Sequence, residues 1–162
     1  MERFSKDELE FFVRESNAIE AIRRDPTKAE LEEAERFLKL EQVTVQDLER
    51  FVKVYEPRAL LRSKKGMNVI IGKHTPPSGG PIIPDMLMQI VENANNREHP
   101  FDVHQEYETL HPFLDGNGRS GRILWAYQMV RQNFWPNLQL GFLHCWYYQS
   151  LDQSRRLKGK VK

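Results

Sequence analysis

The twelve residues HPFLDGNGRSGR, from His111 to Arg122, combine side chains that can carry out chemistry with residues that free the backbone. They include one histidine, one acid, one asparagine, two arginines and three glycines. A tight turn needs one or two glycines, and it does not need a pair of arginines beside them. The composition therefore raises the question of whether this segment is a connecting loop or a site.

The glycines and arginines together are typical of a site for phosphate. Gly116, Gly118 and Gly121 let the backbone adopt positive φ and come close to a ligand. A helix is expected to begin here, and the unpaired N–H groups of a helix N-terminus attract negative charge. Arg119 and Arg122 are three residues apart and so share a helix face, from which guanidinium groups match phosphate oxygens. The segment thus favours a di- or triphosphate.

Two further residues suggest a reaction at this phosphate site. Asp115 is the only acid in the segment, and a lone carboxylate beside a polyphosphate commonly binds Mg²⁺. Histidine titrates near neutral pH, so His111 suits a general base that takes a proton from an attacking hydroxyl. The apolar Phe113 is expected to anchor the loop in the core. Together these residues predict phosphoryl- or nucleotidyl-group transfer, in which positioning and charge stabilisation dominate.

Each of these residues also has a structural interpretation. DGNG is a strong turn signal, the two arginines could face solvent, and His111 could be a partly buried histidine at a helix end. We favour a site because all these features occur together at one helix start.

The first third of the chain contains three signals for helix starts. They are the capping sequences SKDE at Ser5–Glu8, TKAE at Thr27–Glu30 and TVQD at Thr44–Asp47. Pro57 marks the end of the third helix. Apolar residues with helical spacing follow the second and third signals: Leu31, Ala34, Phe37, Leu38, Leu48, Phe51, Val52 and Tyr55.

Residues 63–84 differ from the rest of the chain. Val69, Ile70 and Ile71 are flanked by glycines and prolines, which predicts a short β-hairpin or extended flap, with PPSGGP as an irregular turn. An isolated hairpin is marginally stable in water, so it must lie on the helical body, with one edge left to pair with something else.

Four more helices are expected, one starting near Pro84 and the others spanning about 101–111, 119–132 and 141–156. Their apolar faces comprise Leu87, Ile90, Val91 and Ala94; Val103, Tyr107 and Leu110; Ile123, Leu124, Tyr127 and Val130; and Phe142, Cys145, Trp146 and Tyr148. We therefore predict an all-α, mainly helical fold with a small β-hairpin flap.

The bulk properties fit one soluble globular domain of 162 residues, with 40% hydrophobic and 29% charged residues. A formal net charge of +1 argues against a protein built to coat nucleic acid. The single cysteine, Cys145, makes a reducing cytoplasm the expected location. No apolar run approaches the ~20 residues of a membrane span, and MERFSKDELE is too acidic for a signal peptide. We expect neither a nucleic-acid partner nor a membrane partner.

The segment from His111 to Arg122 resembles the active-site motif of the Fic family, H-x-F-x-[D/E]-G-N-G-R-x-x-R. Every fixed position is filled, by His111, Phe113, Asp115, Gly116, Asn117, Gly118, Arg119 and Arg122. The resemblance spans about Phe51 to Leu151 and implies a helical core, residues 51–162, with the flap at 63–83 and the motif at 111–122. Residues 1–50 would form an N-terminal helical region.

The resemblance implies a protein adenylyltransferase, which transfers AMP from ATP to a Ser, Thr or Tyr hydroxyl of a target protein and releases pyrophosphate. By position, His111 is the general base and Asp115 holds Mg²⁺. Gly116, Asn117 and Gly118 form the anion hole, and Arg119 and Arg122 hold the β- and γ-phosphates. The flap would dock the target by strand pairing, through Asn68, Val69, Ile70, Ile71, Gly72, Lys73 and His74.

A second Fic sequence pattern concerns inhibition. Ser16 and Glu20 are about one helical turn apart, which also fits an ordinary helix surface or cap. They match the family's inhibitory motif [S/T]-x-x-x-E-[G/N], while Ala21 departs from its last position. The segment resembles the self-inhibited class with an N-terminal inhibitory helix, in which Glu20 would pair with Arg122 and block the γ-phosphate. Another implied role for Glu20 is to orient a water that removes AMP from modified targets.

Two alternatives remain open at this point. One is transfer of another phosphate-containing group, which the intact GNGR with both arginines makes less favoured than use of ATP. The other is a nucleotide-binding regulatory module without turnover, against which His111 argues because a binder needs no base. His104, seven residues before His111, is expected to be structural. The target, its acceptor residue, the adenine pocket and homo-oligomerisation are left open by the sequence.

Overall fold

The computed structural model of the chain describes residues 3–133. Over that range it contains α1 (Lys6–Ile19), α2 (Lys28–Leu38), α3 (Val45–Tyr55), α4 (Ile82–Asn95), α5 (Pro100–Leu110) and α6 (Asn117–Arg131). The mainly helical fold is therefore confirmed. The helix predicted at about 141–156 lies outside the described residues.

The predicted starts of the first three helices are confirmed. Ser5, Thr27 and Thr44 each accept a hydrogen bond from the backbone N–H three residues later, and the acid at that position bonds back to the cap. Each reciprocal pair satisfies two of the N–H groups that a helix start leaves without partners. Pro84 lies in the first turn of α4, as expected.

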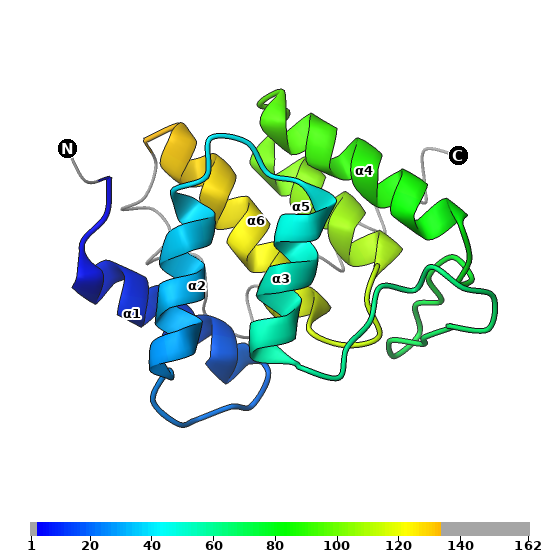
Figure 1. The fold of residues 1–162 in the computed structure, drawn as a ribbon, viewed down its shortest axis with the longest axis horizontal. Helices are drawn as coiled ribbons and strands as arrows, with labels where there is room; N and C mark the ends of the chain where they lie inside the picture. Colours follow the sequence, from blue (N-terminus) through cyan, green and yellow to red (C-terminus); the bar gives the residue numbers. More distant parts are fainter. Residues whose placement is uncertain (1–2, 134–162) are drawn as a thin grey trace.

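Helix α6 is the centre of the molecule. It runs between the α2–α3 pair and the α4–α5 pair, and it contacts each of the other described helices (Figure 1). Buried residues lie on all sides of it, including polar ones near its start. The first turn of α6, which carries the GNGR sequence, is thus enclosed by the rest of the fold.

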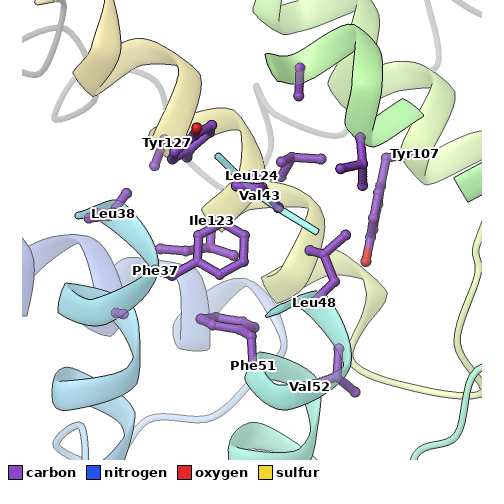
Figure 2. Close-up of a cluster of buried hydrophobic side chains, with 14 of the residues drawn as sticks. Phe37, Leu38, Val43, Leu48, Phe51, Val52, Tyr107, Ile123, Leu124 and Tyr127 are labelled. Atoms are coloured by element: carbon purple, nitrogen blue, oxygen red, sulfur yellow. The ribbon is translucent and has the colours of Figure 1, made fainter. Parts of the chain in front are cut away.

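Aromatic and aliphatic side chains from α2, α3 and α6 form the middle of the core (Figure 2). The Phe37 ring meets Phe51 and Tyr127 edge-on, with centroids 5.7 Å and 6.1 Å apart. Such pairs add about 0.5–1.5 kcal/mol beyond the area that they bury. The apolar residues predicted for α4, α5 and α6 are all buried, as are those of α3. This core fixes the position of α6.

Helix α1 belongs to the same core. Leu9, Phe12, Val13 and Ile19 are buried where α1 packs on α2 and α6. Burying each large apolar side chain stabilises the contact by roughly 1.5–3 kcal/mol. The end of α1, which carries Ser16 and Glu20, is therefore held next to the start of α6.

The predicted β-hairpin flap is not confirmed. Between α3 and α4 the described chain is irregular, with single antiparallel bridges between Ile71 and His74 and between Leu61 and Phe113. Extending the Ile71–His74 bridge outward would pair Val69 with Pro76, and proline has no N–H for a strand ladder. The β-branched run predicted a strand, but Pro76, which is assigned to an irregular turn, would take the position opposite Val69. None of the described helices is both long and apolar enough to cross a membrane.

Candidate active site

The segment between α5 and α6 is a tight loop held by its own backbone and by Asn117. The Asn117 side chain accepts from the Phe113 N–H and donates to the Phe113 carbonyl, both at 2.8 Å. The Phe113 side chain is 1% exposed, which confirms its predicted role as an anchor in the core. Asn117 is predicted to help form the anion hole, and in the structure its side chain shapes the loop. Its backbone N–H remains in the first turn of α6.

His111 ends α5 in a left-handed conformation, with φ 51° and ψ 64°. Its N–H donates to the Tyr107 carbonyl at 2.9 Å, which closes the last turn of the helix. The neighbouring loop is tied to the segment before the flap, because Leu114 N–H donates to the Leu60 carbonyl at 3.0 Å. The predicted base therefore lies at a fixed corner of the backbone, beside the start of α6.

The N-terminus of α6 has the properties of an anion site. Gly116 precedes the helix with φ 77°, a conformation that favours glycine, and no side chain caps this end. The N–H groups of the first turn have no carbonyl within the helix to bind, and the helix dipole adds partial positive charge. These donors suit a phosphate group.

A carboxylate oxygen already lies against this turn. A Cβ atom placed on Gly118 would be 2.2 Å from Oε1 of Glu20 and 3.0 Å from Nη1 of Arg122. Only a residue without a side chain allows an anionic oxygen so close to the backbone. The geometry at Gly118 is that of an anion cradle, with Glu20 supplying the anion.

Arg122 connects α6 to the end of α1. Its guanidinium is fully buried, and it donates through Nε to Ser16 Oγ at 2.8 Å. Its Nη2 donates to the Ser16 carbonyl and to Glu20 Oε1, each at 2.8 Å. The structure thus brings together Ser16, Glu20 and Arg122, which are far apart in sequence.

Ala21 is the residue at which this chain departs from the inhibitory pattern, and its backbone conformation shows why the pattern has glycine or asparagine there. It has φ 61° and directly follows Glu20, the residue that caps α1. The Ile22 N–H bonds back to the Asn17 carbonyl at 3.0 Å, so α1 ends in a left-handed turn. Glycine and asparagine are the residues that adopt this conformation most readily. The chain forms the same turn with alanine, at a cost in backbone strain.

Arg119 points toward α3, unlike Arg122. It is 3% exposed and donates from Nη2 to the carboxylate of Glu56, while its Cζ lies 5.6 Å from the centre of the Tyr55 ring. Burial raises the pKa of Tyr55, so the ring under the cation stays neutral. Nε and Nη1 of Arg119 are buried and have no hydrogen-bond partner among the described residues. Nothing in the sequence around Glu56 indicated this contact.

Asp115 is exposed at the mouth of the loop, and its Oδ1 accepts from the Gly116 N–H at 2.7 Å. Mg²⁺ bound to polyphosphate takes one or two carboxylates and fills its remaining positions with water and phosphate oxygens. One accessible carboxylate next to the anion cradle fits that donor set. No cluster of three or more His, Cys, Asp or Glu side chains suited to a metal occurs within residues 3–133.

The flap residues lie near the end of α5. The His74 ring Nε2 is 2.9 Å from the Thr109 carbonyl, and Ile70 is 76% exposed. In the described chain, the backbone groups of Val69 and Ile70 form no hydrogen bond with other backbone groups. His104, in contrast, is buried with Nδ1 3.0 Å from the Gly121 carbonyl, which fits its expected structural role.

One network near the site was not anticipated from the sequence. The buried Glu30 carboxylate accepts from Asn17 Nδ2 at 3.1 Å, from the Thr27 N–H at 2.8 Å and from Arg24 Nη1 at 2.6 Å. Burial opposes the charge, but these hydrogen bonds outweigh it and lower the pKa of Glu30. The network fixes the last turn of α1 to the first turn of α2. The capping box predicted only the Thr27 contact.

The model of the Fic/DOC family matches residues 31–129, more than half of the chain. The protein adenylyltransferase Fic of Drosophila ananassae is 36% identical over 77 residues, which cover 42% of this chain and 15% of that protein. The proteins of the same name from Drosophila virilis and Drosophila persimilis are 36% and 35% identical over 77 residues, 16% and 15% of their lengths. The chain thus covers less than a fifth of these relatives. No solved structure matches it at a significant level.

Proposed function

The chain belongs to the Fic/DOC family, and from that premise we propose that it is a protein adenylyltransferase that uses ATP and a target protein. The observation that carries the proposal is the approach of the Glu20 carboxylate to Gly118 and Arg122. There an anionic oxygen lies against the backbone at Gly118 and accepts from the Arg122 guanidinium, which supports a phosphate site at the N-terminus of α6. Relatives that carry the name adenylyltransferase support the same reaction.

The proposed reaction uses His111 and the start of α6. His111 takes the proton from a Ser, Thr or Tyr hydroxyl of the target, and the hydroxyl oxygen attacks the α-phosphorus of ATP. A new P–O bond forms as the bond to the β-phosphate oxygen breaks, which yields the AMP ester and pyrophosphate. Arg122 and the amides of Gly116, Asn117 and Gly118 stabilise phosphate charge, and Arg119 is proposed to assist them.

Asp115 is the residue that would hold Mg²⁺, which supplies neutralisation of phosphate charge when bound. The flap would present the target. Among residues 3–133 the backbone of Val69 and Ile70 forms no hydrogen bond with other backbone groups, which fits addition of an extended segment by strand pairing. We also propose a cytoplasmic location, which the single cysteine, Cys145, fits.

We further propose that Glu20 inhibits this reaction. Its carboxylate bonds the buried Arg122, the cation that a γ-phosphate needs, and lies against Gly118. Because Glu20 is 32% exposed, its side chain has room to move away when the site opens. Removal of Glu20 should therefore free Arg122 for ATP.

The test compares wild type with Glu20→Gly, each incubated with Mg²⁺ and ATP labelled at either the α- or the γ-phosphate. Label that enters protein from the α-position alone supports AMP transfer, and the Glu20→Gly variant should incorporate more of it. Label from the γ-position alone would indicate a kinase, and tight ATP binding without label would indicate a regulatory module. Adding His111→Ala to Glu20→Gly should abolish transfer while ATP binding is retained.

A further inference from the structure

Arg62 is a buried cation in the segment between α3 and the flap. It is 0% exposed, and its guanidinium donates to four backbone carbonyls. Nε donates to His111 at 2.7 Å and Nη2 to Leu110 at 2.8 Å. Nη1 donates to Met67 at 3.1 Å and to Pro77 at 2.9 Å.

No carboxylate balances this charge among residues 3–133, and burial alone lowers the pKa of Arg62. The cation is solvated by carbonyl dipoles. Burying a charge in this way costs free energy unless every partner is held in good hydrogen-bonding geometry. A buried arginine arranged in this way fixes the positions of its partner carbonyls relative to one another. The role of Arg62 therefore depends on the segments to which these carbonyls belong.

Two of the carbonyls belong to the end of α5. The last carbonyls of a helix have no partner within it, and they attract a cation. Arg62 binds those of Leu110 and His111, while the His111 N–H bonds Tyr107. The backbone of His111 is therefore held on both sides, in its left-handed conformation.

The other two carbonyls lie on opposite sides of the flap, at Met67 before its tip and at Pro77 after it. The backbone of Arg62 extends the same connection, because its N–H donates to Pro112 and its carbonyl accepts from the Gly80 N–H. The base of the flap and the loop that carries His111 thus converge on one side chain.

We propose that Arg62 is a positioning residue that fixes the position of the flap relative to His111. A hydroxyl of the target that the flap presents then meets the His111 imidazole. This inference rests on the proposed function. It concerns the target and the base, and it leaves ATP binding to the start of α6. Loss of a residue needed only for folding would impair AMP transfer and ATP binding alike, whereas loss of Arg62 should impair AMP transfer and leave ATP binding unchanged.

The kinetic test uses Arg62→Met, which removes the donors, and Arg62→Lys, which keeps the charge with fewer donors, each in the Glu20→Gly background. Misplacement of a reacting group by ~1 Å can cost on the order of a hundredfold in rate. We expect kcat for AMP transfer per folded molecule to fall at least about tenfold in Arg62→Met and less in Arg62→Lys. The KM for ATP should stay within about twofold, because Arg62 does not contact the start of α6.

The control is Arg36→Met. Arg36 is only partly buried, with its side chain 23% exposed, and it binds Glu33 and Asp47 away from the loop. This variant should lower stability without changing kcat per folded molecule. Equal kcat losses in Arg62→Met and Arg36→Met, or a loss confined to the KM for ATP, would overturn the inference.

Amide hydrogen exchange without ATP gives a readout that does not depend on the reaction. Exchange over residues 66–80 and 110–114 should rise together in Arg62→Met and remain unchanged in Arg36→Met. If the two segments do not rise together, Arg62 does not join them and the proposal is wrong. If Glu20→Gly transfers no AMP, the proposed function fails on its own, and exchange still decides whether Arg62 couples flap to loop.

Discussion

Glu20 and Gly118 are in closer contact than two residues with side chains could be. Oε1 of Glu20 would lie 2.2 Å from a Cβ atom on Gly118, and the same oxygen accepts from Nη2 of Arg122 at 2.8 Å. One carboxylate oxygen thus lies against the backbone at Gly118 and accepts from the guanidinium of the proposed phosphate site. The proposed inhibition therefore predicts that this oxygen and ATP compete for the same site.

The first prediction compares two variants, Glu20→Gln and Ser16→Ala, that weaken the contact with Arg122 to different extents. Hydrogen bonds to charged groups are worth about 1.5–3 kcal/mol, and Glu20 and Arg122 are both charged. Glu20→Gln should therefore raise self-modification by roughly tenfold or more. Ser16→Ala removes a neutral acceptor from Arg122 and leaves the Glu20 carboxylate in place, so it should raise self-modification less than Glu20→Gln does. The measurement is the initial rate of label incorporation from α-labelled ATP, with Glu10→Gln on the exposed face of α1 as control. Equal rates in Glu20→Gln and wild type would refute inhibition by this contact.

The second prediction separates removal of the carboxylate from damage to its site. In Gly118→Ala the new methyl would lie 2.2 Å from Oε1 of Glu20, at the tip of a side chain that is 32% exposed, and 3.0 Å from Nη1 of the buried Arg122. We expect Glu20 to move and the fold to be retained. In the proposed reaction, a phosphate oxygen approaches the backbone where this methyl would stand. Gly118→Ala should therefore stay inactive, although Glu20 is displaced, in contrast with Glu20→Gly.

Calorimetry of ATP binding checks this in the Glu20→Gly background. Adding Gly118→Ala should weaken ATP binding at least about tenfold, a loss of about 1.4 kcal/mol. If the double variant binds ATP as tightly as Glu20→Gly, the phosphate does not lie at Gly118.

The third prediction concerns strain at Ala21, which has φ 61°. The left-handed conformation costs a residue with a Cβ atom roughly 1–2 kcal/mol, and glycine regains part of this after its larger entropy loss on folding. Ala21→Gly should stabilise the protein by about 0.5–1 kcal/mol and raise Tm by about 1–4 °C. Ala18→Gly, inside α1, is the control and should destabilise by about 0.5–1 kcal/mol. A Tm for Ala21→Gly at or below that of wild type would contradict the strain at this position.

Local signals in the sequence were sufficient for most of the fold. The capping boxes at Ser5, Thr27 and Thr44 and the apolar spacing of α4 to α6 depend on neighbours within one or two turns, and the structure has them as expected. The prediction of a β-hairpin flap was not confirmed, because a strand needs a partner with which its backbone can form hydrogen bonds. Val69 carries β-forming side-chain chemistry, but the residue facing it would be Pro76.

The site could be located from the sequence but not completed. The glycines, His111 and the arginines lie within one short segment, so their chemistry was readable. Glu56 and Arg62 reach the same segment from the region between α3 and the flap, through contacts that no local pattern encodes. Two arginines that look equivalent at a spacing of three also differ in the fold: Arg122 faces α1, whereas Arg119 faces α3.

The fourth prediction uses the lowered pKa of Glu30. A carboxyl with a folded-state pKa below its unfolded value of about 4.3 contributes stability above that pH, and the contribution is lost as pH falls through the folded-state pKa. The free energy of unfolding of wild type should thus fall more steeply than that of Glu30→Gln as pH drops from about 5 toward 3. Urea unfolding at pH 7, 5 and 3.5 measures the difference. Glu32→Gln, at an exposed position of α2, is the control and should follow wild type. Parallel curves for wild type and Glu30→Gln would refute the linkage.

The last prediction asks what Arg119 does. Glu56→Gln leaves Arg119, at 3% exposure, without a charged partner, whereas Arg119→Met leaves Glu56, whose side chain is 33% exposed and able to hydrate. An uncompensated buried charge is the costlier outcome, so Glu56→Gln should destabilise more than Arg119→Met in urea unfolding. ATP affinity should show the opposite order in the Glu20→Gly background. Arg119→Met loses a phosphate ligand and should weaken binding about tenfold, while Glu56→Gln removes a competing carboxylate and should not weaken it. If Arg119→Met binds ATP as tightly as its parent, Arg119 joins α3 to α6, and Arg122 is the guanidinium that serves the nucleotide.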